Sequence, residues 1–176
     1  MKRVVLVAVG PAPRDWLEQV AATASEILGV EVMVAEAVLP LPAADRARKQ
    51  ILARAILAQL RALPDPGASR VLGVTEADLY APGLNFVFGE ADLGGRGAVI
   101  SLARLRPEYY RLGANPALLL GRAVKEAVHE LGHTYGLSHC ARPSCVMHFS
   151  ITLADTDRKG ARPCADCQAQ GPAPSP

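Results

Sequence analysis

The sequence lacks any apolar run long enough to cross a membrane. The longest one near its start, Val4–Val9, stops at Gly10 and Pro11. A membrane helix needs about 20 apolar residues, and the core of a signal peptide needs about 7–15. Neither a membrane span nor an export signal is therefore predicted, and we expect a cytoplasmic protein that does not bind membranes.

Clustered positive charge is also missing. The net charge is +2, and lysine and arginine are interspersed with acidic residues along the chain. A nucleic-acid-binding face would gather its basic residues in one patch, so no nucleic-acid partner is expected. The chain has no glycine-rich phosphate loop, no nucleophilic serine or cysteine arrangement and no internal repeat. Its oligomeric state cannot be predicted.

What the sequence does contain is typical of a single globular domain: 176 residues, half of them apolar. Apolar, β-branched runs predict buried strands, and apolar residues at helical spacing predict helices between them. Strands are expected at 3–9, 30–34 and 70–75, and helices at 14–28 and 43–62. Strands that alternate with helices favour right-handed crossovers and a largely parallel sheet, which makes the fold class α/β.

This alternation ends after residue 75. Two short strands, 85–89 and 97–102, follow with no helix between them, and the link 90–96 contains the two adjacent glycines of a tight reversal. One strand of this pair should therefore run antiparallel to the rest, so that the sheet is mixed.

The segment 129–140, HELGHTYGLSHC, predicts a metal site. Residues four apart lie on the same face of a helix, so His129 and His133 can direct two imidazoles at one ion. Imidazole is a common zinc ligand. Glu130 flanks the metal without being a ligand, and its carboxylate can take a proton from a zinc-activated water.

Gly136 allows a third histidine to reach the same ion. Glycine at the C′ position adopts a positive φ easily, ends the helix and turns the chain. His139 can then complete three nitrogen ligands. Three protein ligands with one open position are typical of a catalytic zinc, whereas a structural zinc is closed by four.

The helix that carries this segment should run over 116–135, with Asn115 as N-cap and Pro116 at its first position. Arg122 and Glu126 lie on the side of the helix that holds the histidines. Their spacing of four residues would allow an ion pair.

Four cysteines lie close to this segment or after it. Cys164 and Cys167 have the spacing of a zinc knuckle, and Cys140 and Cys145 precede them. In a reducing compartment such cysteines are metal ligands more often than disulfides. Two disulfides in a secreted protein are the alternative, and the missing export signal disfavours it.

The pattern of histidines and glycine resembles the metzincin signature of metallopeptidases. The order Cys140, Cys145, Met147 and then Cys164-Ala165-Asp166-Cys167 is similar to the archaemetzincins, and this resemblance is specific over 129–167. It implies a metzincin-like twisted sheet, an active-site helix, and a small C-terminal subdomain stabilised by a structural zinc on the four cysteines. Together with the catalytic ion, the chain would hold two zincs.

The resemblance also implies two further roles. Met147 would be the methionine of the Met-turn, the apolar floor under the catalytic metal. The antiparallel edge strand, placed at 84–89, would bind an extended substrate through its backbone, so Asn85, Phe86, Val87 and Phe88 are candidate substrate-binding residues. His148 is expected to be a bystander.

Together these patterns predict a cytoplasmic zinc metalloprotease that hydrolyses peptides or proteins, with Glu130 as general base. The alternative from another class is a non-catalytic, zinc-stabilised peptide-binding domain of the same fold. A hydrolase for a different substrate is also open, because ligands alone do not define a substrate. Whether cleavage is internal or from the amino end is also open. We expect one domain, 1–167, divided into subdomains 1–136 and 137–167, followed by a flexible tail, 168–176.

Overall fold

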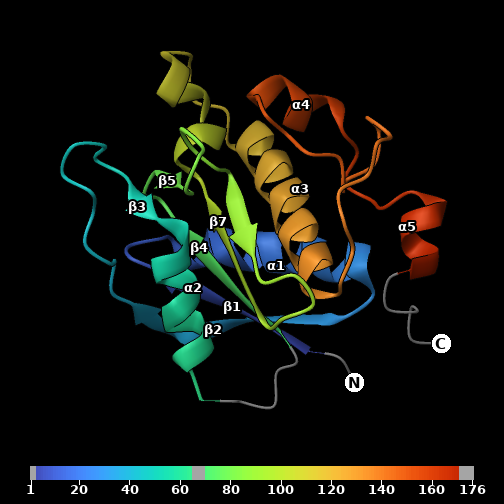
Figure 1. The fold of residues 1–176 in the computed structure, drawn as a ribbon, viewed down its shortest axis with the longest axis horizontal. Helices are drawn as coiled ribbons and strands as arrows, with labels where there is room; N and C mark the ends of the chain where they lie inside the picture. Colours follow the sequence, from blue (N-terminus) through green and yellow to red (C-terminus); the bar gives the residue numbers. More distant parts are fainter. Residues whose placement is uncertain (1–2, 65–69, 171–176) are drawn as a thin grey trace.

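The structure is a computed structural model that describes residues 3–64 and 70–170 (Figure 1). Its centre is a five-stranded sheet with strand order β2-β1-β4-β7-β6, in which only the β6–β7 pair is antiparallel. The predicted mixed, mostly parallel sheet is thereby confirmed. The strands are β1 (Arg3–Val9), β2 (Glu31–Leu39), β4 (Arg70–Thr75), β6 (Gly89–Ala91) and β7 (Gly97–Ser101).

Helices cover both faces of this sheet. Alternate residues of a strand point to opposite faces. In β1, Val4 and Leu6 belong to the core that contains α1 (Arg14–Leu28) and α3 (Pro116–Thr134). Val7 and Val9 pack instead in the core of α2 (Ala53–Ala62). Burial on both faces explains why β1 reads as a continuous apolar run.

The helix expected at 43–62 is ten residues shorter than predicted. Residues 45–50 form a turn instead, in which the Asp45 carboxylate accepts hydrogen bonds from the backbone N–H groups of Ala47 and Arg48, each at 2.9 Å. Aspartate competes with the helix in this way because its short side chain can bond nearby backbone groups. After the turn, β3 (Ile51–Leu52) pairs with β5 (Leu79–Tyr80) in a small parallel sheet that the sequence did not predict.

The edge strand was also misplaced. It is β6, Gly89–Ala91, and the predicted residues Asn85–Phe88 form an irregular segment before it. The reason is that Val87 donates its N–H to Leu79 of β5 at 3.0 Å, so this segment is drawn towards the small sheet. Pairing with β7 starts where Phe88 accepts a hydrogen bond from Ser101 N at 2.8 Å.

Smaller elements complete the fold. Two 3-10 turns, η1 (Ala103–Leu105) and η2 (Pro107–Tyr110), precede α3, and α4 (Leu153–Arg158) and α5 (Ala165–Gln170) follow it. Helix α5 extends three residues into the segment predicted as a flexible tail, and the rest of that segment lies outside the described residues. The predicted division into two subdomains stays a prediction. No helix in the described part of the chain has the length and apolar character that a bilayer crossing requires.

Candidate active site and metal centres

Helix α3 positions the central residues of the site. It begins as predicted, with Asn115 Oδ1 accepting a hydrogen bond from Leu118 N at 3.0 Å and Pro116 at its first position. It ends at Thr134, and Gly136 follows with a φ of 90°, donating its N–H to His133 O at 2.9 Å. Glycine tolerates this left-handed conformation because it has no Cβ. The chain therefore turns back towards α3 immediately after the second histidine.

The three predicted histidines converge on one point. His133 Nε2 lies 3.1 Å from His129 Nε2 and 3.2 Å from His139 Nε2. Ligands about 2.0–2.1 Å from a tetrahedral zinc are separated by roughly 3.3 Å, so the arrangement of these nitrogens fits that ion. Gly136 makes the turn between His133 and His139, and this turn brings the third imidazole back to the other two.

Backbone carbonyls fix the orientation of two of these rings. The Nδ1 atoms of His129 and His133 lie 2.7 Å from the carbonyl oxygens of Val146 and Leu137, respectively. A carbonyl oxygen can only accept, so Nδ1 carries the proton in each ring and the Nε2 lone pair faces the common point. This is the usual way in which ligand histidines are held.

The environment also keeps these imidazoles neutral. Burial lowers the pKa of all three histidines, most strongly that of His129, and the positive charge of Lys159 lowers them further. The neutral form is the one that binds a metal. The donor set therefore fits zinc in protonation as well as in geometry.

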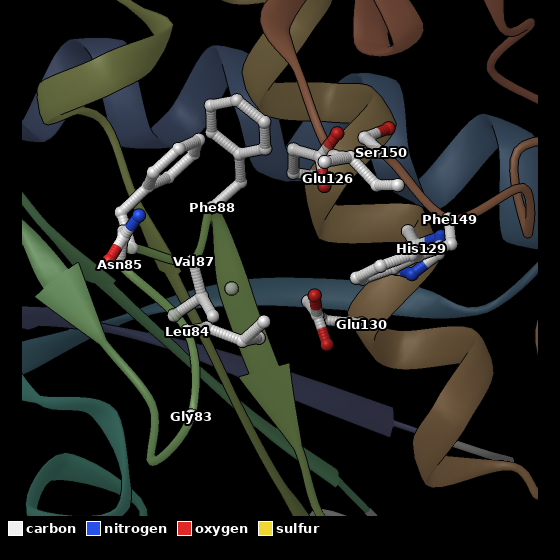
Figure 2. A pocket seen from close by; sticks show the side chains of 13 residues that line it. Gly83, Leu84, Asn85, Val87, Phe88, Glu126, His129, Glu130, Phe149 and Ser150 are labelled. Atoms are coloured by element: carbon white, nitrogen blue, oxygen red, sulfur yellow. The ribbon is translucent and has the colours of Figure 1, made fainter.

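Glu130 lies beside the histidines and not among them. Its side chain is buried, and together with His129 it lines a cavity of about 320 Å³ (Figure 2). Burial raises the pKa of Glu130 well above its usual value, and the charge of Glu126 adds to this. A carboxylate in this place can take up a proton next to the metal position.

Met147 lies beneath the same part of α3. It is fully buried, and its sulfur would be only 2.5 Å from a Cβ at Gly132, between the two helical histidines. Glycine at 132 thus allows the methionine to approach the helix backbone closely. The role of Met147 as the floor of a Met-turn stays a prediction. His148 lies outside the histidine cluster, and its Nδ1 bonds Cys140 O at 3.0 Å.

The four cysteines form a second, separate cluster. They are free thiols, with Sγ–Sγ distances of 3.9 Å for Cys140–Cys164 and 3.8 Å for Cys145–Cys167. Thiolates about 2.3 Å from a tetrahedral zinc are separated by roughly 3.8 Å, so this donor set also fits zinc. A backbone hydrogen bond from Cys167 is the main cause that lowers the pKa of Cys164 to about 7, which favours its thiolate.

The segment predicted to bind substrate lines the same cavity as Glu130. Asn85, Phe86, Val87 and Phe88 line it, although not as a strand, and so do Phe149 and Ile151 from the chain after Met147. In Figure 2, Asn85, Val87 and Phe88 lie across the cavity from Phe149. The side chains of Phe149 and Ile151 are exposed, and no sequence pattern predicted that they line this cavity. Only folding brings this loop to the cleft.

The predicted pairing of Arg122 with Glu126 is wrong. Arg122 binds Asp157 through two hydrogen bonds of 2.7 Å, and Glu126 Oε1 lies 3.0 Å from Lys159 Nζ. Both partners come from α4 or the residue after it, a segment without a sequence signal. The loop after Met147 therefore packs its charged residues against α3, over the face that also carries the histidines.

Comparisons with known proteins identify the family of this chain. Residues 1–170 match the sequence profile of peptidase family M54. A curated archaemetzincin of Methanopyrus kandleri is 51% identical over 144 residues, which cover 81% of this chain and 78% of the relative. That of Methanocaldococcus jannaschii is 43% identical, over 94% of this chain and 90% of the relative.

The chain belongs to the archaemetzincins.

Solved structures support the same assignment. The crystal structure of the Methanopyrus kandleri archaemetzincin aligns with a TM-score of 0.80 and 45% identity, covering 94% of this chain and 91% of the other. The Archaeoglobus fulgidus archaemetzincin, complexed with malonate, aligns with a TM-score of 0.82 and 37% identity, over 96% and 99% of the two chains. The expected family is confirmed, and the protein is a zinc metallopeptidase.

Proposed function

We propose that this archaemetzincin hydrolyses peptide bonds with Glu130 as general base and with His129, His133 and His139 as the ligands of the catalytic zinc. The observation that carries this proposal is the convergence of three neutral imidazole nitrogens, spaced 3.1 and 3.2 Å apart, beside a carboxylate that lines a cleft. A fourth, open position is what distinguishes such a site from a structural one.

Zinc bound by the three histidines would supply Lewis acidity, which polarises the scissile carbonyl and makes water a better nucleophile. The residues of the chain do the rest. Glu130 accepts the proton of the attacking water and delivers it to the leaving amine. Its burial keeps bulk water away from the carboxylate, and the carbonyls of Val146 and Leu137 prevent the imidazoles from rotating out of position.

An extended peptide would lie along the edge of the sheet in this proposal. Strand β6 is the last strand beyond β7, and Asn85–Phe88 precede it along the cavity that Glu130 lines. Backbone pairing at an edge strand gives affinity with little side-chain selectivity. We therefore retain Asn85, Phe86, Val87 and Phe88 as candidate substrate-binding residues and add the edge of β6 itself.

A second zinc, held by Cys140, Cys145, Cys164 and Cys167, would be structural. Four thiolates close the tetrahedron and leave no position for water or substrate. Cys140 is directly bonded to His139 in the chain, and its N–H donates to Met147 O at 2.9 Å. The cysteine site thus holds both the third histidine and the floor of the catalytic site in place.

Two measurements test the proposal. The zinc content of the protein, purified without chelator at neutral pH, should be two per chain. Glu130→Ala should keep both zincs and lose at least a hundredfold in kcat, about 2.7 kcal/mol of barrier, because only the proton acceptor is removed.

Wild-type cleavage rates in Glu130→Ala would refute the general-base role. One zinc per chain, surviving His133→Ala but not Cys164→Ser, would favour the non-catalytic peptide-binding domain instead. Peptide binding to the zinc-loaded protein without cleavage would support the same conclusion.

A further inference from the structure

The cavity beside Glu130 has a polar end that the proposed reaction does not use. Phe86, Val87 and Phe88 are among the residues that line it. Glu126 and Ser150 lie at the end drawn opposite Gly83 (Figure 2). Glu126 precedes Glu130 by four residues on α3, which is one helical turn or about 6 Å along the axis. A long substrate side chain next to the scissile bond, which lies near Glu130, would therefore reach Glu126 with its outer end.

The carboxylate at this end belongs to a deeply buried ion pair. Glu126 is 2% exposed and Lys159 is 0% exposed, and Lys159 Nζ lies 3.0 Å from Glu126 Oε1. Thr156 Oγ1 also donates to Glu126 Oε1, at 3.0 Å. Burial of two charges costs several kcal/mol per ion, so a pair of this kind gives little stability by itself. Its presence beside a cleft points to a role in recognition.

Two polar atoms at this end, Glu126 Oε2 and Ser150 Oγ, can hydrogen-bond to a ligand. Both contacts of the Glu126 carboxylate within the described residues fall on Oε1, which leaves Oε2 as an acceptor. The hydroxyl of Ser150 is buried and has no hydrogen-bond partner in the described part of the chain. An unsatisfied buried hydroxyl is costly, so a ligand that hydrogen-bonds to Ser150 Oγ is favoured over one that does not.

Charge balance decides which side chain fits. The ammonium of Lys159 already neutralises the Glu126 carboxylate, so a basic side chain would bring an uncompensated positive charge, and an acidic one would meet the Glu126 carboxylate. The walls are aromatic and apolar, with Phe86 and Phe88 in edge-to-face contact at a centroid distance of 5.2 Å. The pocket thus suits a neutral aromatic group with a hydrogen-bonding tip.

We propose that this cavity is a specificity pocket for tyrosine at one residue adjacent to the scissile bond. The phenol hydroxyl would donate to Glu126 Oε2 and accept from Ser150 Oγ, while the ring packs against Phe86 and Phe88. This inference rests on the proposed function, since it assigns the substrate of the same site. A site built around a substrate hydroxyl discriminates strongly against the analogue that lacks it.

The first experiment measures cleavage by the zinc-loaded full chain. Peptides that vary the residues on both sides of one bond are compared by mass spectrometry. At one position, tyrosine should exceed phenylalanine at least about tenfold in kcat/KM, with Lys, Arg, Asp and Glu slower than both. Equal rates for tyrosine and phenylalanine, with cleavage established, would overturn the pocket and leave the peptidase proposal intact.

The second experiment does not require cleavage. Two peptide hydroxamates that differ only in tyrosine or phenylalanine are titrated calorimetrically into the zinc-loaded wild type. The tyrosine compound should bind at least about tenfold more tightly. If it does so in a protein that cuts no peptide, the pocket is supported and the peptidase proposal fails. Equal affinities would contradict the pocket.

Variants locate the source of the preference. Glu126→Leu with Lys159→Met removes both charges together, because either change alone would leave a buried, unpaired charge. Ser150→Ala removes the hydroxyl alone. The tyrosine-to-phenylalanine ratio of hydroxamate affinities should fall to near one in the double variant and partly in Ser150→Ala. Zinc content and Tm report whether each variant is folded, and an unchanged ratio in a folded double variant would refute the assignment.

Discussion

The two candidate metal-ligand clusters of this protein lie on different kinds of structural element. His129 and His133 stand on α3, a helix of 19 residues whose inner face is packed in the main core. The cysteines stand on loops and on the short helix α5, in a region whose longest regular elements have six residues. Packing of α3 therefore holds the histidine cluster, whereas we expect a bound metal to hold together the loops that carry the cysteines.

Their accessibility differs in the same direction. His139 is exposed and His129 lines the cleft together with Glu130, whereas none of the four cysteines is exposed and Cys145 and Cys167 are buried, at 1% and 7% exposure. A catalytic metal site keeps one coordination position open for substrate, so the surrounding fold must hold its three protein ligands in place. A structural metal site can instead be closed by four protein ligands. We therefore expect packing to make the histidine cluster rigid and a bound metal to make the cysteine cluster rigid.

The largest effect is expected when the cysteine cluster is broken. Cys167→Ser should remove one zinc and lower stability by at least about 3 kcal/mol, since a structural zinc supplies roughly 10–16 kcal/mol in zinc-finger peptides. For a chain of this length, that corresponds to a fall in Tm of about 6–12 °C. Hydrogen exchange should rise over 140–167. Unchanged exchange there would mean that packing, and not metal, holds these loops.

A smaller effect on stability is expected at the histidine cluster. His133→Ala should abolish peptidase activity and lose the other zinc, yet lower stability by only about 1 kcal/mol, because α3 is held by its core face. Calorimetry beside zinc analysis checks this. Equal losses of Tm in His133→Ala and Cys167→Ser would erase the proposed difference between the two clusters.

The smallest effect should come from the surface of the cysteine region. Arg142, between Cys140 and Cys145, forms an ion pair with Asp166, between Cys164 and Cys167, but the two side chains are 57% and 66% exposed. Exposed pairs contribute about 0–1 kcal/mol, so Arg142→Ala should change the free energy of unfolding by no more than about 0.5 kcal/mol. A denaturant titration measures it. A loss of stability as large as that in Cys167→Ser would show that this ion pair, and not thiolate ligation of a metal, joins the Cys140–Cys145 segment to the Cys164–Cys167 segment.

The sequence predicted the long, strongly patterned elements well. Residues 3–9, 14–28 and 70–75 have the predicted limits, because their apolar patterns are strong and because Gly10 and Gly29 directly end the first two. Helix α2 was overextended, since the Asp45 turn depends on one side chain capping two backbone groups. The edge strand moved to Gly89–Ala91 because a bridge from Val87 to Leu79, distant in sequence, competes for the preceding segment.

The sequence by itself determined which histidines and which cysteines come together as two candidate metal-binding groups, because helical spacing, the turn at Gly136 and the Cys164–Cys167 spacing are local properties. Only the tertiary structure decided what surrounds them. Lys159 reaches Glu126 across 33 positions of chain, and Phe149 reaches His139 with a ring-centroid distance of 4.7 Å, through a loop with no regular pattern. Such contacts are set by how the loop packs on α3, and no periodicity in the sequence records that packing.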